Sequence, residues 1–523
     1  MEAPLTPLEF ARRARRLYPH REAVVDGDRR FTYAQFLDRV DRWSSVLRDL
    51  GIGPGDRVAC IAPNSHAHLE AYYAIPQLGA VIVPINYRLS LDDFTYILNH
   101  SGAKVVCVQA DYLDLVDQIR GAIPGVQHFV AFSGEKPNWI SYEDRLAAAP
   151  PVTDLPEIDE LSTLSINYTS GTTARPKGVM LTHRNQYLNI LCRLAHTPMT
   201  SADRYLWTLP MFHVNGWCFA WIVTAVGGTH VCLHKPETKR IFELLRSERI
   251  SLFCAAPTIL IGIANSPSEL HRGLPRGIRV LTAGAPPAAA TIERVEGEFG
   301  WTITHVYGLT EVSPIVTVCE PRPEDAQLGL REVAIHKSRQ GVEAIASAEV
   351  RVVDDQDREV PHDGATLGEV VMRGHAVMRG YYNDPEATAQ AMRGGWFRSG
   401  DAAVVHPDGY LEIRDRWKDV IISGGENISS IEVEGLLLRH PSVQEVAVVG
   451  KPHEKWGETP VAFVVLKAGA TGDAAELRAF CRAHLAHFKA PHEFTFVTEL
   501  PKTSTGKIQK YVLRGGRPNI ARQ

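Results

Sequence analysis

Several features that define other classes of protein are missing from this chain of 523 residues. Its eight cysteines form no C-x-x-C pair, which argues against a cysteine zinc site or a disulfide framework and fits reduced thiols. The longest mostly apolar stretch, residues 218–226, is far too short to cross a bilayer, so we expect no transmembrane segment. Lys and Arg number 56 against 60 Asp and Glu, a formal net charge of -4 that favours no nucleic-acid partner.

The N-terminus also lacks the apolar core of a signal peptide. Arg12, Arg13, Arg15 and Arg16 give it the basic character of a transit peptide, but a patterned strand follows directly. We therefore expect a solvated helix face there and a cytoplasmic protein.

The composition that is present is ordinary for globular proteins, with 45% hydrophobic and 22% charged residues. A chain of this length usually divides into two or more domains. A stripe of apolar residues from Phe36 to Leu50, stopped by Gly51, predicts a helix. Strand patterns at residues 58–61, 80–85 and 105–108 alternate with helical ones, and the alternation resumes further along. This order predicts an α/β fold whose doubly wound parallel sheets are covered on both faces.

The pattern changes in the last third of the chain. Between about residues 340 and 415, short strands joined by turns predict a β-barrel-like subdomain. From Lys418 onward, helix and strand signals fit one small α+β unit. We therefore expect a large domain over residues 1–417 and a small C-terminal domain over residues 418–523.

A polar loop at residues 168–178, Tyr-Thr-Ser-Gly-Thr-Thr-Ala-Arg-Pro-Lys-Gly, lies between two apolar strand patterns. Its hydroxyls, backbone N–H groups and one ammonium could surround the oxygens of a polyphosphate. It is not a Walker A loop, because Pro176 precedes Lys177 and Gly178 follows it. Composition alone would also allow a polar surface turn. The donors are Thr169, Ser170, Gly171, Thr172, Thr173 and Lys177.

The order of residues in this loop resembles the phosphate loop of the adenylate-forming enzymes, which include acyl-CoA synthetases, peptide-synthetase adenylation domains and luciferases. Further motifs of that family follow in the family's order: residues 305–311, 396–401, 423–427 and 501–507. The resemblance covers essentially the whole chain and is to the fatty or aryl acid–CoA ligase branch. Two departures are Ala174, where the family usually has Gly or Ser, and Ser399, which replaces Thr.

The resemblance implies a binding site for ATP and Mg²⁺. It implies that Tyr307 stacks on adenine, that Asp401 and Arg416 bind the ribose, and that Glu311 and Thr169 hold Mg²⁺, an ion that prefers hard oxygen ligands. Lys507 would bridge the substrate carboxylate and the α-phosphate. The full implied ATP set is Thr169, Ser170, Gly171, Thr172, Thr173, Lys177, Gly284, Ala285, Pro286, Tyr307, Gly308, Thr310, Asp401, Arg416 and Lys507.

The same resemblance implies sites for the acid and for CoA. Residues 210–217 resemble the segment that lines the acyl pocket, with His213 between the pocket and the thiol tunnel and Trp217 as an acyl gate. A histidine in so apolar a run could equally be a satisfied core residue. The implied acyl pocket is His213, Val214, Gly216, Trp217, Ala283 and Gly284; the implied CoA contacts are Ser423, Gly424, Gly425 and Glu426.

The predicted function is ATP-dependent activation of a carboxylic acid to an acyl-adenylate, followed by transfer to the thiol of CoA. The implied catalytic residues are Lys507, Thr310, His213 and Lys177, and the family's hinge falls at Lys418, about which a mobile C-terminal domain rotates between the two steps. An amide-forming ligase that uses an amine such as an amino acid is the alternative, since only residues 423–427 favour CoA. A non-catalytic adenylate-binding homologue is less favoured, because the charged site residues are all present. The sequence predicts neither the acid nor the oligomeric state, and a homodimer stays open.

Overall fold

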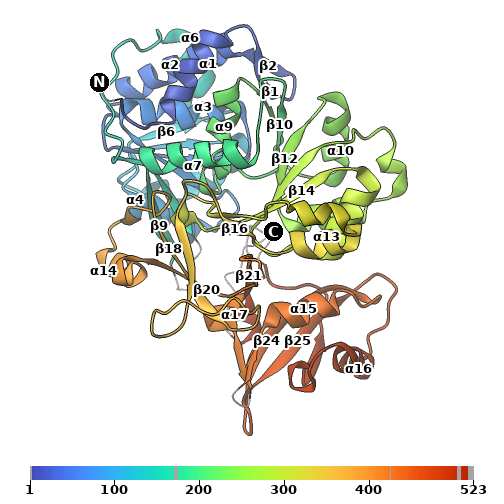
Figure 1. Cartoon of the computed structure of the whole chain (residues 1–523). Helices are drawn as coiled ribbons and strands as arrows, with labels where there is room; N and C mark the ends of the chain where they lie inside the picture. The colour runs from blue at the N-terminus through green and yellow to red at the C-terminus, as the bar shows by residue number, and fades with distance from the viewer. Residues whose placement is uncertain (1–2, 170–174, 424–425, 503–507, 516–523) are drawn as a thin grey trace. The chain divides into compact units, whose positions relative to one another are not determined.

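The structure is a computed structural model that describes residues 3–169, 175–423, 426–502 and 508–515 (Figure 1). The chain folds into two compact units: Met1–Glu349 with Arg373–Phe397, and Val350–Met372 with Arg398–Gln523. The expected boundary between residues 417 and 418 stays a prediction. Within the described ranges, no helix is both long enough and apolar enough to cross a membrane.

The first unit contains a nine-stranded sheet in the order β16–β15–β14–β13–β12–β10–β11–β1–β2. Its six central strands, from β14 to β1 in this order, run parallel, as the alternation of strands and helices predicts. The outer strands β15, β16 and β2 run antiparallel to their neighbours. The strands are β1 (Glu22–Asp26), β2 (Arg29–Thr32), β10 (Arg204–Trp207), β11 (Thr229–Cys232), β12 (Leu252–Ala255), β13 (Arg279–Thr282), β14 (Thr302–Tyr307), β15 (Thr317–Val318) and β16 (Val342–Glu343).

Helices cover both faces of this sheet. Leu206, Phe253 and Val280 form one core with α10, α11 and α12. On the other face, Tyr205 stacks on Phe219 of α9, with ring centroids 4.5 Å apart. Because side chains alternate along a strand, helices on both faces bury a central strand such as β12 on both sides, and all four of its residues are apolar. These helices are α9 (Phe219–Val226), α10 (Thr238–Ser247), α11 (Pro257–Ala264) and α12 (Ala289–Arg294).

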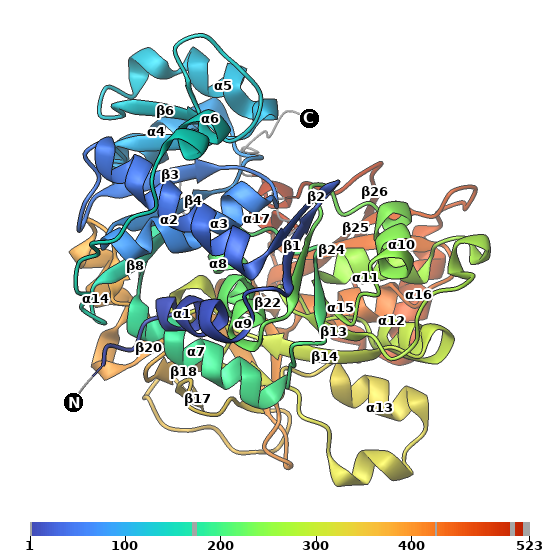
Figure 2. The same cartoon turned by 90° about the horizontal axis from the view of Figure 1, so that it is seen from above.

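The first unit also contains an eight-stranded sheet in the order β19–β9–β8–β4–β3–β5–β6–β7. Strands β8 to β7 in this order are parallel, whereas β9 and β19 are antiparallel additions. One face packs against α4 and α5, and Figure 2 shows α2 and α3 on the other. The elements are β3 (Arg57–Ile61), β4 (Val81–Ile85), β5 (Val105–Val108), β6 (His128–Ala131), β7 (Ile140–Ser141), β8 (Thr163–Thr169), β9 (Lys177–Thr182), β19 (Gly380–Tyr381), α2 (Tyr33–Asp49), α3 (His66–Ala74), α4 (Leu91–Ser101) and α5 (Leu113–Gln118).

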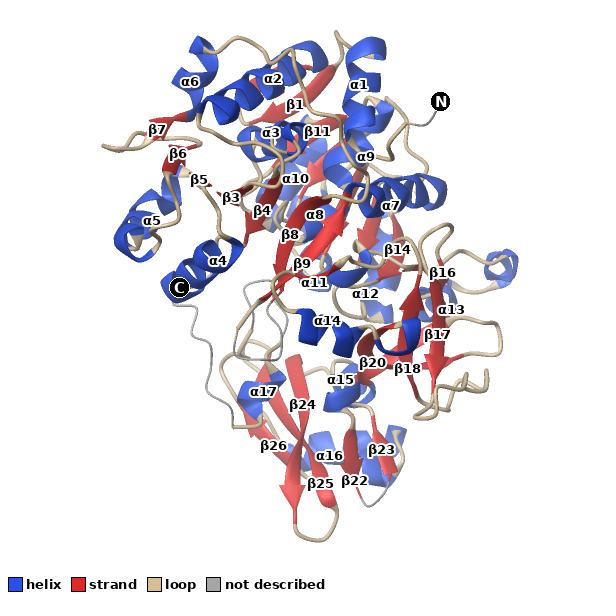
Figure 3. Cartoon of the chain, turned by 90° about the vertical axis from the view of Figure 1, so that its left-hand side faces the viewer, coloured by secondary structure: helices blue, strands red, loops and turns tan. Residues whose placement is uncertain are grey.

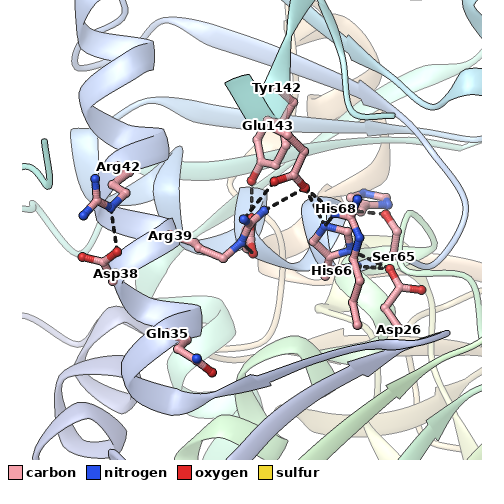
Figure 4. Close-up of polar contacts among 12 residues, drawn as sticks. Asp26, Gln35, Asp38, Arg39, Arg42, Ser65, His66, His68, Tyr142 and Glu143 are labelled. Atoms are coloured by element: carbon pink, nitrogen blue, oxygen red, sulfur yellow. Dashed lines mark hydrogen bonds and ion pairs between the residues drawn. The ribbon is translucent and has the colours of Figure 1, made fainter. Parts of the chain in front are cut away.

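A buried ionic cluster joins β1, α2, α3 and the helix α6 (Tyr142–Ala148) in this unit (Figure 4). His66 places Nδ1 2.6 Å from Asp26 Oδ2 and Nε2 3.1 Å from Glu143 Oε1. Arg39 donates from Nε to Glu70 Oε1 at 2.6 Å and from a terminal nitrogen to Glu143 Oε2 at 3.0 Å. Burial disfavours the positive imidazole, but the hydrogen bonds to both carboxylates prevail and raise the pKa of His66 to about 9. His66 is therefore an imidazolium at neutral pH.

The second unit contains a four-stranded sheet, β17–β18–β20–β21, and a five-stranded sheet, β23–β22–β25–β24 with β26 beside β25. Figure 3 shows α15 and α16 beside the long strands β24 and β25, with which they form an apolar core. The backbone N–H of Ser430 donates to Asp415 Oδ2 at 2.8 Å, which ties α15 to β21. The elements are β17 (Glu349–Val353), β18 (Gly368–Arg373), β20 (Phe397–Val405), β21 (Leu411–Arg416), β22 (Ile421–Ser423), β23 (Glu426–Ile428), β24 (Val443–His453), β25 (Gly457–Leu466), β26 (Glu493–Phe496), α15 (Ser430–Leu437), α16 (Ala474–His484) and α17 (Lys510–Leu513).

Candidate active site

The predicted phosphate loop connects β8 to β9, which pair in antiparallel register. Thr169 and Lys177 are direct partners at the open end of this ladder. Gly178 is required for the packing below them, because a Cβ there would lie 2.8 Å from Ile166 Cγ2. The predicted ligands Ser170, Gly171, Thr172 and Thr173 lie outside the described residues.

A cation, a phenol and a carboxylate meet beside this ladder. Lys177 Nζ lies 4.9 Å from the ring centroid of Tyr381, and the Tyr381 hydroxyl donates to Glu311 Oε1 at 2.9 Å. The backbone N–H of Met378 donates to Glu311 O at 2.7 Å, which fixes the main chain of Glu311. The structure thus brings together Lys177 and Glu311, 134 positions apart in the sequence. Sequence reasoning missed Tyr381, because its role depends on the pairing of β19 with β9 and no local motif marks it.

The residues predicted to hold the nucleotide base follow two adjacent parallel strands. β13 and β14 pair with Thr282 opposite His305, so the residues that follow them emerge at one edge of the sheet. This edge therefore carries Gly284, Ala285 and Pro286 from one strand and Tyr307, Gly308 and Thr310 from the next. Gly284 has φ +93°, a conformation that favours glycine. Gly308 also has to be glycine, since a Cβ would lie 1.9 Å from Pro314 O.

The predicted acyl segment has an unusual backbone. Five consecutive residues, Val214 to Cys218, have φ between 46° and 66°, and only Gly216 among them is glycine. Left-handed conformation costs about 1–2 kcal/mol for each residue with a side chain. The surrounding structure must therefore stabilise this turn, and such strain is typical of functional sites.

Buried amides hold the left-handed turn in place. Asn215 donates from Nδ2 to Ser165 Oγ at 2.9 Å and to Gln186 Oε1 at 3.2 Å, and its Oδ1 accepts from Asn167 Nδ2 at 3.1 Å. Because Ser165 and Asn167 belong to β8, this network connects the acyl segment to the strand that leads into the phosphate loop. Asn64 fixes the preceding stretch by accepting from Met211 N at 2.7 Å. Sequence reasoning missed Asn215 and Asn64, although an amide inside the apolar run 210–217 was an available signal.

The other predicted acyl-pocket residues are mostly buried. Val214 and Trp217 are buried, and Ala283 is buried after β13. A Cβ on Gly216 would lie 2.4 Å from the Trp207 ring, so this glycine allows the turn to approach β10. His213 is half-buried, and its backbone N–H donates to Pro210 O at 3.1 Å.

The predicted ribose ligands meet in the second unit. Asp401 and Arg416 are cross-strand partners on β20 and β21, with Arg416 Nε 3.0 Å from Asp401 Oδ1. Two hydrogen bonds fix the backbone at Asp401. Its N–H donates to Ser399 Oγ at 3.0 Å, and Ser399 Oγ donates to Val370 O at 2.7 Å. Ser399 therefore performs this structural role where the family usually has threonine.

The predicted hinge and CoA residues also belong to the second unit. Lys418 lies in a single 3₁₀ turn, Trp417–Asp419, between β21 and β22. Ser423 and Glu426 are partners at the end of the β22–β23 hairpin, and Gly424 and Gly425 lie outside the described residues. Lys507 lies outside them too, whereas Lys502 and Ile508 on either side form an antiparallel bridge.

Comparison with known proteins identifies the family. Residues 10–382 match the family described as AMP-binding enzyme, and residues 432–507 match the AMP-binding enzyme C-terminal domain. The 4-hydroxybutyrate–CoA ligase 2 of Metallosphaera sedula is 43% identical over 519 residues, which cover 98% of this chain and 94% of that protein. The peroxisomal acetate/butyrate–CoA ligase AAE7 of Arabidopsis thaliana is 40% identical with the same coverage, 98% and 94%.

Solved structures show the same fold over nearly the whole chain. An anthranilate CoA ligase in complex with anthranoyl-AMP has a TM-score of 0.89 at 26% identity, with 98% of each chain covered. The amide bond synthetase McbA from Marinactinospora thermotolerans has a TM-score of 0.85 at 25% identity, covering 97% of this chain and 99% of that one. The chain therefore belongs to the AMP-binding family of adenylate-forming enzymes, in its acid–CoA ligase branch.

Proposed function

We propose that the cluster of Lys177, Tyr381 and Glu311 holds the triphosphate of ATP in this acid–CoA ligase. The reaction has two steps. The substrate carboxylate attacks the α-phosphate, the bond to pyrophosphate breaks, and an acyl-adenylate forms; the CoA thiol then attacks the acyl carbon and AMP leaves with the bonding electron pair. One observation carries the proposal: the ammonium of Lys177 and the carboxylate of Glu311 both contact Tyr381, beside the ends of β8 and β9.

The charges in this cluster fit the first step. Two anions approach each other in it, so catalysis depends on positioning and on neutralising charge. Lys177 supplies a fixed positive charge next to the loop, and Lys507 is proposed to supply a second at the reacting carboxylate. Thr310, after β14, would offer its hydroxyl to the α-phosphate.

The residues at this place also fit Mg²⁺. Over the described part of the chain, no group of three His, Cys, Asp or Glu side chains is arranged to hold a metal. Mg²⁺ needs no such cage, since it is typically bound by one or two carboxylates together with substrate phosphates. Glu311, oriented by Tyr381, and the hydroxyl of Thr169 would hold it, and the ion would offset phosphate charge.

We further propose that the left-handed turn at residues 214–218 forms the acid site, with His213 and Trp217 beside the acyl group. Asp401 and Arg416 would bind the ribose, residues 284–286 and Tyr307 the adenine, and residues 423–426 the pantetheine arm of CoA. The cytoplasmic location, the hinge at Lys418 and the assembly state, with a homodimer still open, stay predictions.

A pyrophosphate-release assay tests the function. The acids named in the relatives, 4-hydroxybutyrate, acetate, butyrate and anthranilate, would each be supplied with CoA, with a mixture of amino acids, or with neither. Product analysis by mass spectrometry is expected to show a CoA thioester. An amide-forming activity is the second candidate, because an amide bond synthetase has nearly the same fold. Amide product from an acid that yields no thioester would replace CoA by an amine as the acceptor.

A further inference from the structure

A buried arginine that has no counter-ion among the described residues lies on the helix α7 (His183–His196), which follows β9. Arg193 is 1% exposed, and none of its three guanidinium nitrogens has a hydrogen-bond partner among the described residues. The ionisable groups that interact electrostatically with it include the imidazole of His196 and the thiols of Cys192, Cys254 and Cys218, of which Cys192 also interacts directly with the guanidinium. Burial raises the pKa of all three thiols, so they are neutral and offset no charge.

An unpaired charge in this position is costly. Leaving one partner of a buried ion pair uncompensated is strongly destabilising. Burial lowers the pKa of Arg193, but a guanidinium stays protonated in proteins. Its neighbours in the described core thus leave its positive charge uncompensated, and an anion from outside the chain would supply the missing negative charge.

Other buried polar groups around Arg193 also lack partners. Gln186 Nε2, Ser313 Oγ and Tyr205 OH are fully buried and make no hydrogen bond within the described ranges. Cys218 lies between two of these residues, with its Sγ 3.2 Å from Gln186 Oε1 and 3.4 Å from the backbone oxygen of Ser313. These donors and Arg193 therefore line one region between α7, the start of α9 and the Tyr205 face of the nine-stranded sheet.

This region adjoins the proposed acid site at one end. Gln186 accepts from Asn215 of the left-handed turn, and Ser313 comes two residues after Glu311. Gln186 and Arg193 lie seven residues apart on α7, which puts them on one face of the helix and separates them by roughly 10 Å along its axis. An acid whose reacting carboxyl lies near Thr310 would thus extend its other end toward Arg193.

We propose that Arg193 binds a second carboxylate, so that the substrate of this enzyme is a dicarboxylic acid. The inference rests on the proposed function and names its substrate class. A carboxylate fits better than a hydroxyl, because it alone supplies the missing negative charge and can accept two parallel hydrogen bonds from the guanidinium fork. The unpartnered donors of Tyr205 and Gln186 are available for its remaining lone pairs.

Matched acids that differ only at the far end test this proposal. The first series is succinate, 4-hydroxybutyrate and butyrate, and two further series lengthen the chain by one and by two carbons. We expect one dicarboxylate to exceed its hydroxy and methyl counterparts in kcat/KM for pyrophosphate release by about 100-fold or more, the size expected for a buried charge pair. In Arg193→Met, that kcat/KM is expected to fall by about 100-fold while the value for the matching monocarboxylate stays equal or rises.

The matched control is Arg184→Met on the same helix. Arg184 is partly exposed and pairs with Glu160 at 2.8 Å, so its loss is expected to leave both activities unchanged. Binding of the dicarboxylate to the wild-type enzyme without ATP, measured by calorimetry, gives a readout independent of turnover. If Arg193→Met does not fold, the same measurements on Arg193→Gln and the preference of the wild-type enzyme among the matched acids still test the proposal.

Three results would overturn the proposal. They are a wild-type enzyme that prefers the hydroxy or methyl acids in every series, a loss in Arg193→Met that is equal for both classes, and calorimetric binding that Arg193→Met leaves intact. In each of them thioester formation would persist, so the ligase function would stand. If no acid of any class released pyrophosphate or bound, the proposed function itself would fail.

Discussion

Tyr381 is the residue on which the proposed phosphate site depends. Replacing it by Phe removes the hydrogen bond to Glu311 but keeps the ring beneath Lys177. A hydrogen bond to a charged group contributes about 1.5–3 kcal/mol, so Tyr381→Phe is expected to lower kcat/KM for ATP by about 10–100-fold and to raise the Mg²⁺ concentration needed for half-maximal rate. Steady-state kinetics at varied Mg²⁺ measures both.

The control at this scale is the neighbouring Tyr382, whose ring contacts His100 instead. Tyr382→Phe is expected to leave the Mg²⁺ dependence unchanged. If Tyr381→Phe also leaves it unchanged, Glu311 does not hold the metal.

Single residues also show where sequence reasoning stops. Lys177 and Glu311 could be picked out because each stands in a recognisable motif, and the structure brings them together. Tyr381 and Arg193 could not, because nothing local marks a tyrosine on a two-residue strand or an arginine that lacks a partner. Both are defined by tertiary contacts between segments far apart in the chain, which no pattern of spacing contains.

At the scale of elements, the patterned helices and strands were predictable. The apolar stripe from Phe36 to Leu50 is α2, and the strand pattern at residues 105–108 is β5 with the same bounds. In α2 the spacing of the apolar residues reports the buried face, and in β5 the unbroken apolar run reports burial on both faces. The left-handed turn at residues 214–218 was not predictable, because three of its five residues, Val214, Trp217 and Cys218, ordinarily avoid that conformation.

The left-handed turn depends on Asn215, which is fully buried and hydrogen-bonded at both ends of its amide. Asn215→Ala leaves buried partners unsatisfied and is expected to lower the free energy of unfolding by about 1–3 kcal/mol and to raise KM for the acid more than KM for ATP. Urea unfolding and kinetics with varied acid measure these effects. Asn265→Ala, at an exposed amide at the end of α11, is the control. Equal changes in KM for the acid and KM for ATP would mean that the left-handed turn does not form the acid site.

The ionic cluster that joins β1, α2, α3 and α6 gives a prediction for pH. The folded pKa of His66, about 9, lies above the unfolded value of about 6.5, so its stabilising contribution is complete below about pH 6.5 and is lost as pH rises through about 9. This shift corresponds to about 3 kcal/mol. The charged groups that face His66 or extend the cluster are Asp26, Glu143, Glu70, Arg29, Arg39 and His234.

His66→Gln tests this prediction. The free energy of unfolding lost by the variant is expected to be larger at pH 6 than at pH 9.5, when both proteins are unfolded by urea. The exposed His20→Gln is expected to show no such difference. A loss of equal size at the two pH values would mean that the imidazole is not charged in the folded protein.

At the scale of the whole molecule, we expect the two half-reactions to use different arrangements of the C-terminal domain about Lys418. Lys507→Ala is therefore expected to lower adenylate formation by about 10²–10³-fold, as for one contact that stabilises developing charge, and to leave thioester formation from supplied acyl-AMP nearly unchanged. Measuring the rates of adenylate formation and of thioester formation separately tests this prediction. An equal loss in both would remove the distinction between the two arrangements.

The central claim is that the chain forms an acyl-adenylate before any acceptor reacts. The most direct test is acid-dependent exchange of labelled pyrophosphate into ATP in the absence of CoA, because only a reversible first half-reaction supports it. We expect exchange that requires the acid and Mg²⁺, is reduced by Tyr381→Phe, and gives way to net thioester formation when CoA is added. Exchange that fails without CoA for every acid that yields a thioester would mean that no free-standing adenylation step precedes the reaction with the acceptor.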